Sequence, residues 1–335
     1  MLEEAANVYP ADFDAVIIGG GPAGASCALW LKLLGFRPTI VERRPRLGGL
    51  QNDSPYDNVW IAPLIGLSGR EVAENIHRNI LSHDIPCFLE TTVQSVLRAP
   101  SGFIVRLADA SGIKNLRTPY VVLASGVRPQ TGGLRANPRL LVGPGAKVAA
   151  TNFSGKTVAI LGGGDNAFEN FQFIRESGAA EIHIYARTIR ARREFVNKTP
   201  SEQLTVGPYN VDGDTMTVSG RPYDYIVALY GWTPNVNFAL AFDLKRDDRG
   251  FIITDTLSTE TSLENMFAIG EVARRMHPCC VTSMADGVVA AKEIQHRIEE
   301  DCQSSGRISR FQTAPRRSLT TPSDAKPLAG RGCVA

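Results

Sequence analysis

The sequence predicts an α/β fold that contains two parallel-sheet domains, and two glycine-rich turns carry this prediction. Residues 19–24 read GGGPAG and follow the apolar strand 15–18, while residues 162–167 read GGGDNA and follow the apolar strand 158–161. Each turn also opens a helix, and this strand, turn and helix context separates a dinucleotide-binding fingerprint from a chance match. A chain of 335 residues is long enough for two domains with sizeable cores.

The glycines of the first turn have separate roles. Gly19 permits the tight turn, Gly21 lets backbone N–H groups approach a pyrophosphate, and Gly24 lets the helix pack on the strand. A helix over residues 25–34 and a second strand follow, and that strand ends in Glu42, eighteen positions past Gly24. An acidic side chain at this position suits a ribose diol.

The segments between and after the turns predict buried strands that end in small residues. Residues 103–107 form one arm of a hairpin layer that feeds a buried strand at 120–126, and a similar ending recurs at 225–235. Residues 264–271 then return to the first domain as a strand that closes in a Gly-acid pair. A long amphipathic helix is expected over 281–298.

The second turn predicts a different nucleotide. Ala167 replaces the third glycine, which is common in sites for phosphorylated nicotinamide cofactors. Twenty positions on, the strand 181–185 ends without an acid, and Arg187 and Arg190 occupy the ribose position. Guanidinium groups suit a 2′-phosphate through bidentate contacts. The alternative is a solvated, arginine-rich helix face.

Composition and charge exclude several classes of protein. A hydrophobic fraction of 43%, 31 glycines and 20 prolines are typical of a turn-rich α/β enzyme, and no run approaches the roughly 18 apolar residues of a membrane span. Residues 1–14 lack a signal-peptide pattern, so we expect a cytoplasmic protein without a membrane partner. The net charge of +2 is nearly neutral but unevenly placed: the basic C-terminal segment could attract nucleic acid or an acidic protein, yet no interleaved aromatic residues support a nucleic-acid platform, so no nucleic-acid partner is expected. Residues 301–335 are basic and poor in apolar residues, which favours a flexible tail.

Several motifs in order resemble one known family. GGGPAG, GGL at 48–50, ASG at 124–126, GGGDNA, GWTPN at 231–235 and AIGE at 268–271 before a final helix are similar to the low-molecular-weight thioredoxin reductases. These are FAD-containing pyridine nucleotide-disulfide oxidoreductases, and the resemblance covers about residues 12–298.

The resemblance implies two Rossmann-like (three-layer β/β/α) nucleotide-binding domains, the second inserted in the first. The FAD-binding domain would comprise 1–127 and 250–300, and an NAD(P)H-type or second-flavin domain would comprise 128–249. A homodimer is also implied. For FAD the family pattern assigns Gly19, Gly21, Pro22, Ala23, Gly24, Glu42, Arg43, Gly49, Asn58, Val93, Ser125, Gly126, Gly270 and Glu271. For the inner nucleotide it assigns Gly162, Gly164, Asp165, Asn166, Arg187 and Arg190.

The chain departs from the family at the redox motif. Thioredoxin reductases of this size carry Cys-x-x-Cys just before the second turn, whereas residues 143–156 contain no cysteine. Loss of the motif also occurs in thioredoxin-reductase-like ferredoxin–NADP reductases, which share the pattern at 155–165. It occurs too in diflavin-linked disulfide oxidoreductases, in which a second FAD occupies the nicotinamide site.

The expected function is therefore an FAD-dependent oxidoreductase of the thioredoxin reductase type. NADPH is the expected donor, and a disulfide or dithiol, presented by a small redox protein of the thioredoxin type, is the expected acceptor. The alternatives are electron transfer to a ferredoxin-type carrier, a diflavin disulfide oxidoreductase, and a flavin-binding redox sensor without turnover.

Cys279, Cys280 and His277 are the candidate catalytic residues. Both cysteines precede the last helix, whose N-terminus would lower a thiol pKa. A bond between the two is disfavoured, because neighbouring Cα atoms lie about 3.80 Å apart and disulfides need about 4.4 Å or more; the tail thiol Cys333 is an alternative partner. Both could also be small thiols that pack beside the cofactor. His277 could donate a proton. No metal-ligand spacing is present.

Overall fold

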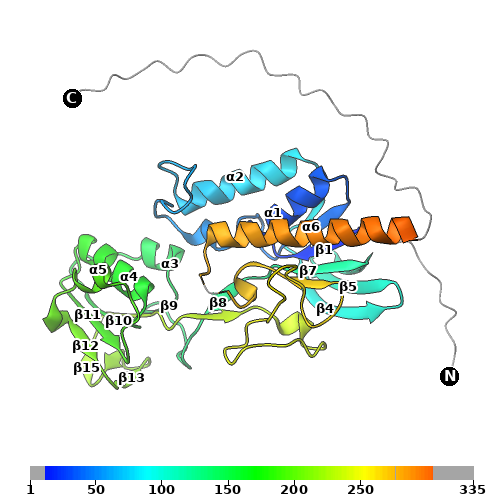
Figure 1. Ribbon diagram of the computed structural model, residues 1–335. Coiled ribbons are helices and arrows are strands. Elements are labelled where there is room, and N and C mark those ends of the chain that lie inside the picture. Colours follow the sequence, from blue (N-terminus) through cyan, green and yellow to red (C-terminus); the bar gives the residue numbers. More distant parts are fainter. Residues whose placement is uncertain (1–11, 276, 305–335) are drawn as a thin grey trace, which may run out of the picture. The chain divides into compact units, whose positions relative to one another are not determined.

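The first sheet is entirely parallel, with strand order β18-β7-β1-β2-β3. The computed structural model describes residues 12–275 and 277–304, and residues up to His296 belong to one compact unit. All four residues of the central strand, β1, are buried because helices cover one face of the sheet and a second, antiparallel sheet covers the other. The strands are β1 (Ala15–Ile18), β2 (Pro38–Val41), β3 (Cys87–Phe88), β7 (Tyr120–Leu123) and β18 (Met266–Ala268) (Figure 1).

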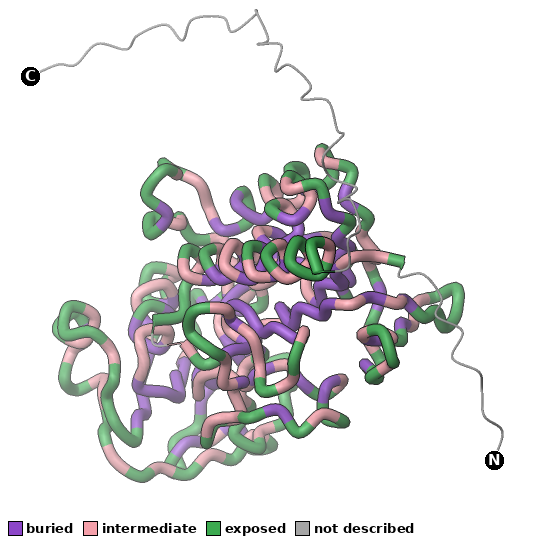
Figure 2. The backbone as a smooth tube through the Cα atoms, turned by 45° about the vertical axis from the view of Figure 1, so that its right-hand side comes forward, coloured by how far each residue is buried: buried purple, intermediate pink, exposed green. Residues whose placement is uncertain are grey.

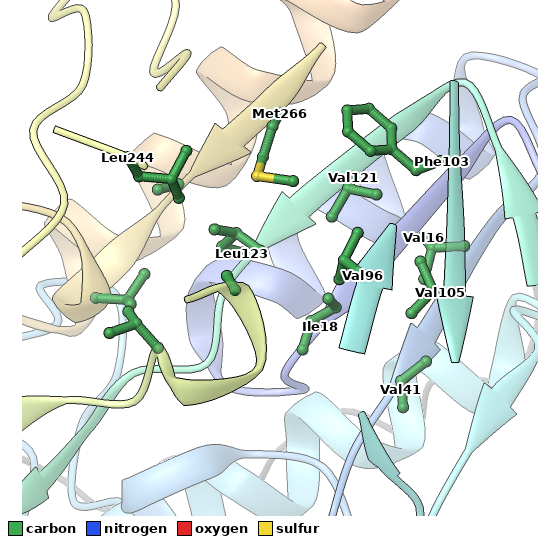
Figure 3. Packing of buried hydrophobic residues seen from close by; sticks show 14 of the residues in the cluster. Val16, Ile18, Val41, Val96, Phe103, Val105, Val121, Leu123, Leu244 and Met266 are labelled. Atoms are coloured by element: carbon green, nitrogen blue, oxygen red, sulfur yellow. The ribbon is translucent and has the colours of Figure 1, made fainter. Parts of the chain in front are cut away.

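An antiparallel meander covers one face of this sheet. It comprises β4 (Thr92–Ala99), β5 (Gly102–Asp109) and β6 (Gly112–Thr118). Side chains that alternate along the strands, such as Val16 and Ile18 of β1, meet Val96 and Phe103 of the meander in one apolar cluster (Figure 3).

Helices cover the opposite face, onto which Ile17 points. They are α1 (Pro22–Leu33), α2 (Gly69–Ser82) and α6 (Cys280–Ser304), and Figure 1 shows them on the same side of β1 and β7. A Cβ added at Gly287 of α6 would overlap the backbone of α1 at Ala23, so only glycine allows this helix contact. Strands β1, β2 and β7 are buried throughout, whereas exposed and partly buried residues alternate along α6, the helix that crosses the middle of Figure 2.

The second sheet repeats this architecture with strand order β12-β11-β10-β16-β9, again entirely parallel. Phe168 and Phe171 of α4 pack on one face with Val158 and Ile160. A small antiparallel sheet covers the other face through Met216. The elements are β9 (Leu140–Val142), β10 (Thr157–Leu161), α4 (Asp165–Glu176), β11 (Glu181–Ala186), β12 (Leu204–Val206), β16 (Tyr225–Ala228), and the covering strands β13 (Val211–Asp212), β14 (Thr217–Val218) and β15 (Arg221–Pro222).

Two antiparallel strands connect the sheets: the chain leaves the first sheet along β8 (Val127–Pro129) and returns along β17 (Trp232–Pro234). The second sheet is thus inserted in the first, and the predicted α/β fold with three layers per sheet is confirmed. The short helices are α3 (Ala146–Ala150), α5 (Arg193–Val196), and the 3₁₀ turns η1 (Gly49–Asp53), η2 (Ser201–Gln203), η3 (Asn237–Ala239) and η4 (Gly270–Val272).

The last helix is longer than predicted. It continues to Ser304, because no glycine or proline interrupts the sequence before Gly306. Residues 301–304 are therefore helical, and the rest of the expected tail, with Cys333, lies outside the described residues. Among the described helices, none is both long and apolar enough to cross a membrane.

A side chain at Gly24 should separate α1 from β1. A Cβ there would overlap the carbonyl oxygen of Gly19 and press on Ile17 and Ala124. We expect Gly24→Val to lower stability by about 1–3 kcal/mol or more and to yield protein without FAD. Thermal melting and the absorption spectrum test this expectation.

Gly164→Ala is the matched control, because Gly164 has φ −98° and no heavy atom within 4 Å of an added Cβ. Full FAD content in Gly24→Val would contradict the role of the first turn.

Candidate functional site

A cleft opens where the carboxyl ends of β1, β7 and β18 meet the start of α1, the position at which parallel sheets bind ligands. We call it the first-turn cleft. Gly270 and Glu271 line it from the turn after β18. The remaining predicted residues that line it are Gly19, Gly21, Pro22, Ala23, Glu42, Arg43, Gly49, Ser125, Gly126, Cys279 and Cys280. Gly24 does not line the cleft, since it supports the contact between α1 and β1.

The backbone of the cleft fits a pyrophosphate. A Cβ at Gly19, whose φ is +111°, would overlap the Ala124 carbonyl, so this turn requires glycine. Gly21 caps the N-terminus of α1, and an added Cβ there would meet only the Cα of Gly49, at 3.7 Å. Gly126 has no neighbour within 4 Å of an added Cβ. Open backbone beside the positive end of a helix suits an anionic group.

Glu42 closes the end of the cleft at which a ribose is expected. Its side chain is 6% exposed, and its two oxygens accept hydrogen bonds from the N–H groups of Gly20 (2.8 Å) and Arg44 (2.9 Å). These bonds hold the carboxylate in place and leave lone pairs for a diol. An adjoining cavity is lined by Glu42, Arg43, Val93 and Phe238. The side chains of Val93 and Phe238 provide apolar walls for a base next to the ribose. The residues present therefore fit FAD.

The turn after β18 is held by a buried carboxylate. Asp286 of α6 is 2% exposed, and it accepts hydrogen bonds from the Gly270 N–H (3.0 Å) and from Nε of Arg275 (2.7 Å). The carboxyl of Glu271 makes no hydrogen bond to the described residues and lines the cleft. Burial raises the pKa of Glu271. Its free oxygens suit the hydroxyl groups of a ribityl chain.

Ser125 and Asn235 join the two connecting strands at the cleft. The Ser125 hydroxyl donates to the Asn235 carbonyl (2.5 Å), and Nδ2 of Asn235 donates to the Ser125 carbonyl (3.0 Å). Asn235 was not among the predicted site residues, although it ends the GWTPN motif. Its place at the end of this motif was the signal from which Asn235 could have been predicted as a site residue.

Cys279 directly precedes α6 and caps its N-terminus. Its Sγ accepts a hydrogen bond from the Thr282 N–H at 3.5 Å and lies 3.5 Å from the Thr282 hydroxyl. Burial alone would raise the pKa of the Cys279 thiol, but hydrogen bonds from Thr282 and from the Val281 N–H lower the pKa below its usual value. The direction predicted from the helix N-terminus is thus present. Burial instead raises the pKa of the neighbouring Cys280 to about 11.

A groove leads from Cys279 away from the cleft. We call it the Cys279 groove. Its walls include the rings of Tyr56, Trp60 and Phe173, and the Tyr56 and Phe173 rings meet edge to face. Asn58 lines this groove and donates to Oε1 of Gln51 (3.0 Å), so it reaches the first-turn cleft only through Gln51.

His277 does not join these groups. Its side chain is exposed and lines neither the first-turn cleft nor the Cys279 groove, while its backbone carbonyl accepts a hydrogen bond from the Thr282 hydroxyl. A catalytic role for the His277 side chain therefore has no support from its position.

The second turn is built like the first. Gly162 has φ +142°, and an added Cβ would overlap the Leu229 carbonyl, while Gly164 caps α4 with open space around it. The loop after β11 folds back onto this turn, since the Arg190 N–H donates to the Gly163 carbonyl at 2.7 Å. This contact holds the backbone of the loop that carries Arg187 and Arg190 against the second turn.

A third arginine has a structural role. Arg192 pairs with Asp165 (3.0 Å) and Glu169 (3.8 Å) and lies over the Trp60 ring. Asp165 is thus occupied by an ion pair at the start of α4. Asn166 lines a further cavity between α4 and the residues of the first-turn cleft.

Comparisons with known proteins agree with this geometry. Residues 13–206 match the family model described as pyridine nucleotide-disulphide oxidoreductase. The chain is 25% identical to the thioredoxin reductase of Borreliella burgdorferi, with 84% of this chain and 90% of that protein covered. It is 31% identical to ferredoxin–NADP reductase 1 of Bacillus mycoides, with 89% and 93% covered.

Solved structures share the fold. The thioredoxin reductase of Lactococcus lactis in its FR conformation superposes with a TM-score of 0.73 at 19% identity, covering 86% of this chain and all of that one. The bacillithiol disulfide reductase Bdr of Bacillus cereus gives a TM-score of 0.70 at 17% identity, covering 85% and 99%.

Removal of Arg187 or Arg190 should weaken NADPH binding selectively. Each charged hydrogen bond to a 2′-phosphate contributes about 1.5–3 kcal/mol, so Arg187→Ala and Arg190→Ala should each weaken NADPH about tenfold or more and leave NADH nearly unchanged. Stopped-flow reduction of the flavin measures both nucleotides. Arg193→Ala, an exposed neighbour, is the control. Equal losses for NADPH and NADH would refute the 2′-phosphate role.

Cys279 should react with iodoacetamide at lower pH than Cys280 and Cys87. The thiolate is the reactive form, and burial raises the pKa of Cys280 and of Cys87 to about 11. A rise in labelling rate below pH 9 should therefore map to Cys279 by mass spectrometry. Thr282→Val, which removes the hydroxyl that contacts Sγ of Cys279 and leaves the N–H donor, should shift this rise to higher pH. A common pH dependence for all three thiols would contradict the assignment.

Proposed function

Since this chain belongs to the pyridine nucleotide-disulphide oxidoreductase family, we propose that it transfers electrons from NADPH to a disulfide that reacts with Cys279. The chain is an FAD-dependent oxidoreductase of the thioredoxin reductase type. The acceptor and the residues that serve it are the parts that we propose.

The residues of the first-turn cleft would hold FAD. The turn at Gly19 and Gly21 would bind the pyrophosphate, Glu42 the ribose, and Glu271 the ribityl chain. Val93 and Arg43 would border the adenine, and Asn58 would act through Gln51. The protein then supplies position and electrostatics, while the cofactor supplies the redox chemistry.

NADPH would occupy the inner site at the start of α4. Arg187 and Arg190 form no ion pair within the described residues and are available for the 2′-phosphate. A second FAD has no 2′-phosphate, so these cations favour NADPH in this site. Release of one FAD per chain on denaturation would agree with this assignment, and release of two would overturn it.

The observation that carries the acceptor is Cys279: like Cys280 it lines both the first-turn cleft and the Cys279 groove, but it is the Sγ of Cys279 that accepts a hydrogen bond from the Thr282 N–H. A disulfide in the groove would meet the thiolate beside the cofactor. The thiolate attacks one sulfur, the S–S bond breaks, one half leaves as a thiolate that takes a proton from solvent, and the other half stays bound to Cys279. FAD, when bound, would supply two electrons. These electrons release the bound half as a thiol and restore the Cys279 thiolate.

A ferredoxin-type carrier is the second candidate acceptor. None of the six cysteines lies in a Cys-x-x-Cys motif, and a relative at 31% identity is named ferredoxin–NADP reductase. A flavin-binding sensor without turnover would consume no NADPH when either acceptor is added.

The proposal extends to the assembly: a homodimer in the cytoplasm that serves a small redox protein. Sedimentation gives the number of chains.

Cys279→Ser should separate the two halves of the reaction. Flavin reduction by NADPH should stay within about twofold of the wild type, because Cys279 does not contact the inner site, whereas disulfide turnover should fall at least a hundredfold because the nucleophile is lost. Cys280→Ser is the matched control and should retain turnover. Unchanged disulfide turnover in Cys279→Ser would reject the thiol route, and undiminished ferredoxin reduction would then favour the second candidate.

A further inference from the structure

The Cys279 groove has a volume of about 520 Å³ and carries acidic side chains without basic ones. Asp57, from the loop after η1, and Glu169 and Glu176, from α4, line it, and no lysine, arginine or histidine is among its lining residues. Arg192 pairs with Glu169 at 3.8 Å. Asp57 and Glu176 are exposed and form no ion pair with any residue that the structure describes. Exposed carboxylates are ionised at neutral pH, so the groove presents unbalanced negative charge beside the thiol.

The aromatic wall of the groove already holds one cation. The guanidinium carbon of Arg192 lies 5.1 Å from the centroid of the Trp60 ring. Trp60 is nevertheless 66% exposed, and Tyr56, which lines the same groove, is exposed as well. Aromatic faces attract ammonium and guanidinium groups. Ring surface for a second cation is therefore accessible next to the carboxylates of the groove.

The loop that supplies Trp60 extends the groove as exposed apolar surface. Val59 is 71% exposed and lies between Asn58 and Trp60, which both line the groove. Ile65 of the same loop is also exposed. A free small disulfide would contact only the walls of the groove, whereas a protein segment would also cover this apolar loop. The surface therefore fits a protein partner, and the charge of the groove selects among such partners.

We propose that the Cys279 groove selects a disulfide on a protein segment in which lysine or arginine flanks the cysteine. The flanking cations would pair with Asp57 and Glu176 while one sulfur of the disulfide meets Cys279. This inference rests on the proposed attack by Cys279 and adds the charge of the substrate; bonds and electrons follow the exchange described above. Asp57 and Glu176 orient the substrate and determine specificity, because the same carboxylates repel an anionic segment.

Three disulfide-linked peptide dimers provide the probes: Lys-Cys-Lys, Ser-Cys-Ser and Glu-Cys-Glu, each acetylated and amidated. NADPH oxidation by the holoenzyme gives kcat/KM for each peptide. Flanking charges also change the intrinsic reactivity of a disulfide, so the readout is the ratio of kcat/KM for the lysine peptide to kcat/KM for the glutamate peptide, compared between variants. A variant that folds poorly lowers both values and leaves the ratio unchanged.

The wild type should prefer the lysine peptide to the serine peptide, and the serine peptide to the glutamate peptide. The ratio should fall about threefold in Asp57→Asn and in Glu176→Gln and about tenfold in the double variant, because one exposed ion pair changes binding by up to about fivefold. In the wild type the ratio should also fall as salt rises from 0.05 to about 0.5 M, since salt screens exposed charges.

Glu202→Gln is the matched control. It removes an exposed carboxylate that does not line the groove, and it should keep the wild-type ratio. An equal ratio in the wild type and the double variant would overturn the inference. So would turnover of cystamine, a free dication, as fast as that of the lysine peptide, because the groove would then serve a small molecule. If Cys279→Ser reduces all three peptides as fast as the wild type does, the proposed thiol route itself fails.

Discussion

The close approach of backbone to backbone at β1, α1 and α6 is the constraint on which the site depends. Gly24 lets α1 lie against the turn at Gly19, and Gly287 lets α6 lie against α1 at Ala23. Because no side chain separates these elements, the start of α1 and the start of α6 reach the same cleft. The hydroxyl of Ser26 adds a hydrogen bond to the Met284 carbonyl at 2.8 Å, which fixes α6 along its axis.

The placement of α6 gives two adjacent cysteines opposite properties. Asp286 accepts hydrogen bonds from Gly270 and Arg275, which joins the turn after β18 to α6. Cys279 then lies exposed at the helix start, where hydrogen bonds from Thr282 lower the pKa of its thiol, whereas burial raises the pKa of the Cys280 thiol, although Cys280 lines the same cleft. One position along the chain therefore changes the direction of the thiol pKa.

The sequence was sufficient for the parts of the site that depend on local backbone. Gly19, Gly21 and Glu42 follow from a fixed spacing between strand, turn and strand, and they line the cleft as predicted. Side chains that act across long sequence distances could not be predicted in this way. Asp286 accepts a hydrogen bond from Gly270, sixteen positions earlier in the chain, because α6 packs against the turn after β18. His277 illustrates the converse. It lies two positions before Cys279, yet its side chain lines neither the first-turn cleft nor the Cys279 groove.

The segment before the second turn borders the site without contributing a thiol, since residues 143–156 contain no cysteine. Gly145 lies in this segment, and an added Cβ would come 3.0 Å from the Asp53 carbonyl oxygen. Residues 143–147 line, together with Asn166 and Glu169 of α4, a cavity that shares Arg43 and Gln51 with the first-turn cleft. Gln51, Tyr56 and Glu169 line both this cavity and the Cys279 groove, so the two spaces meet along one wall. Groups bound in the cavity and in the groove would therefore lie close to each other.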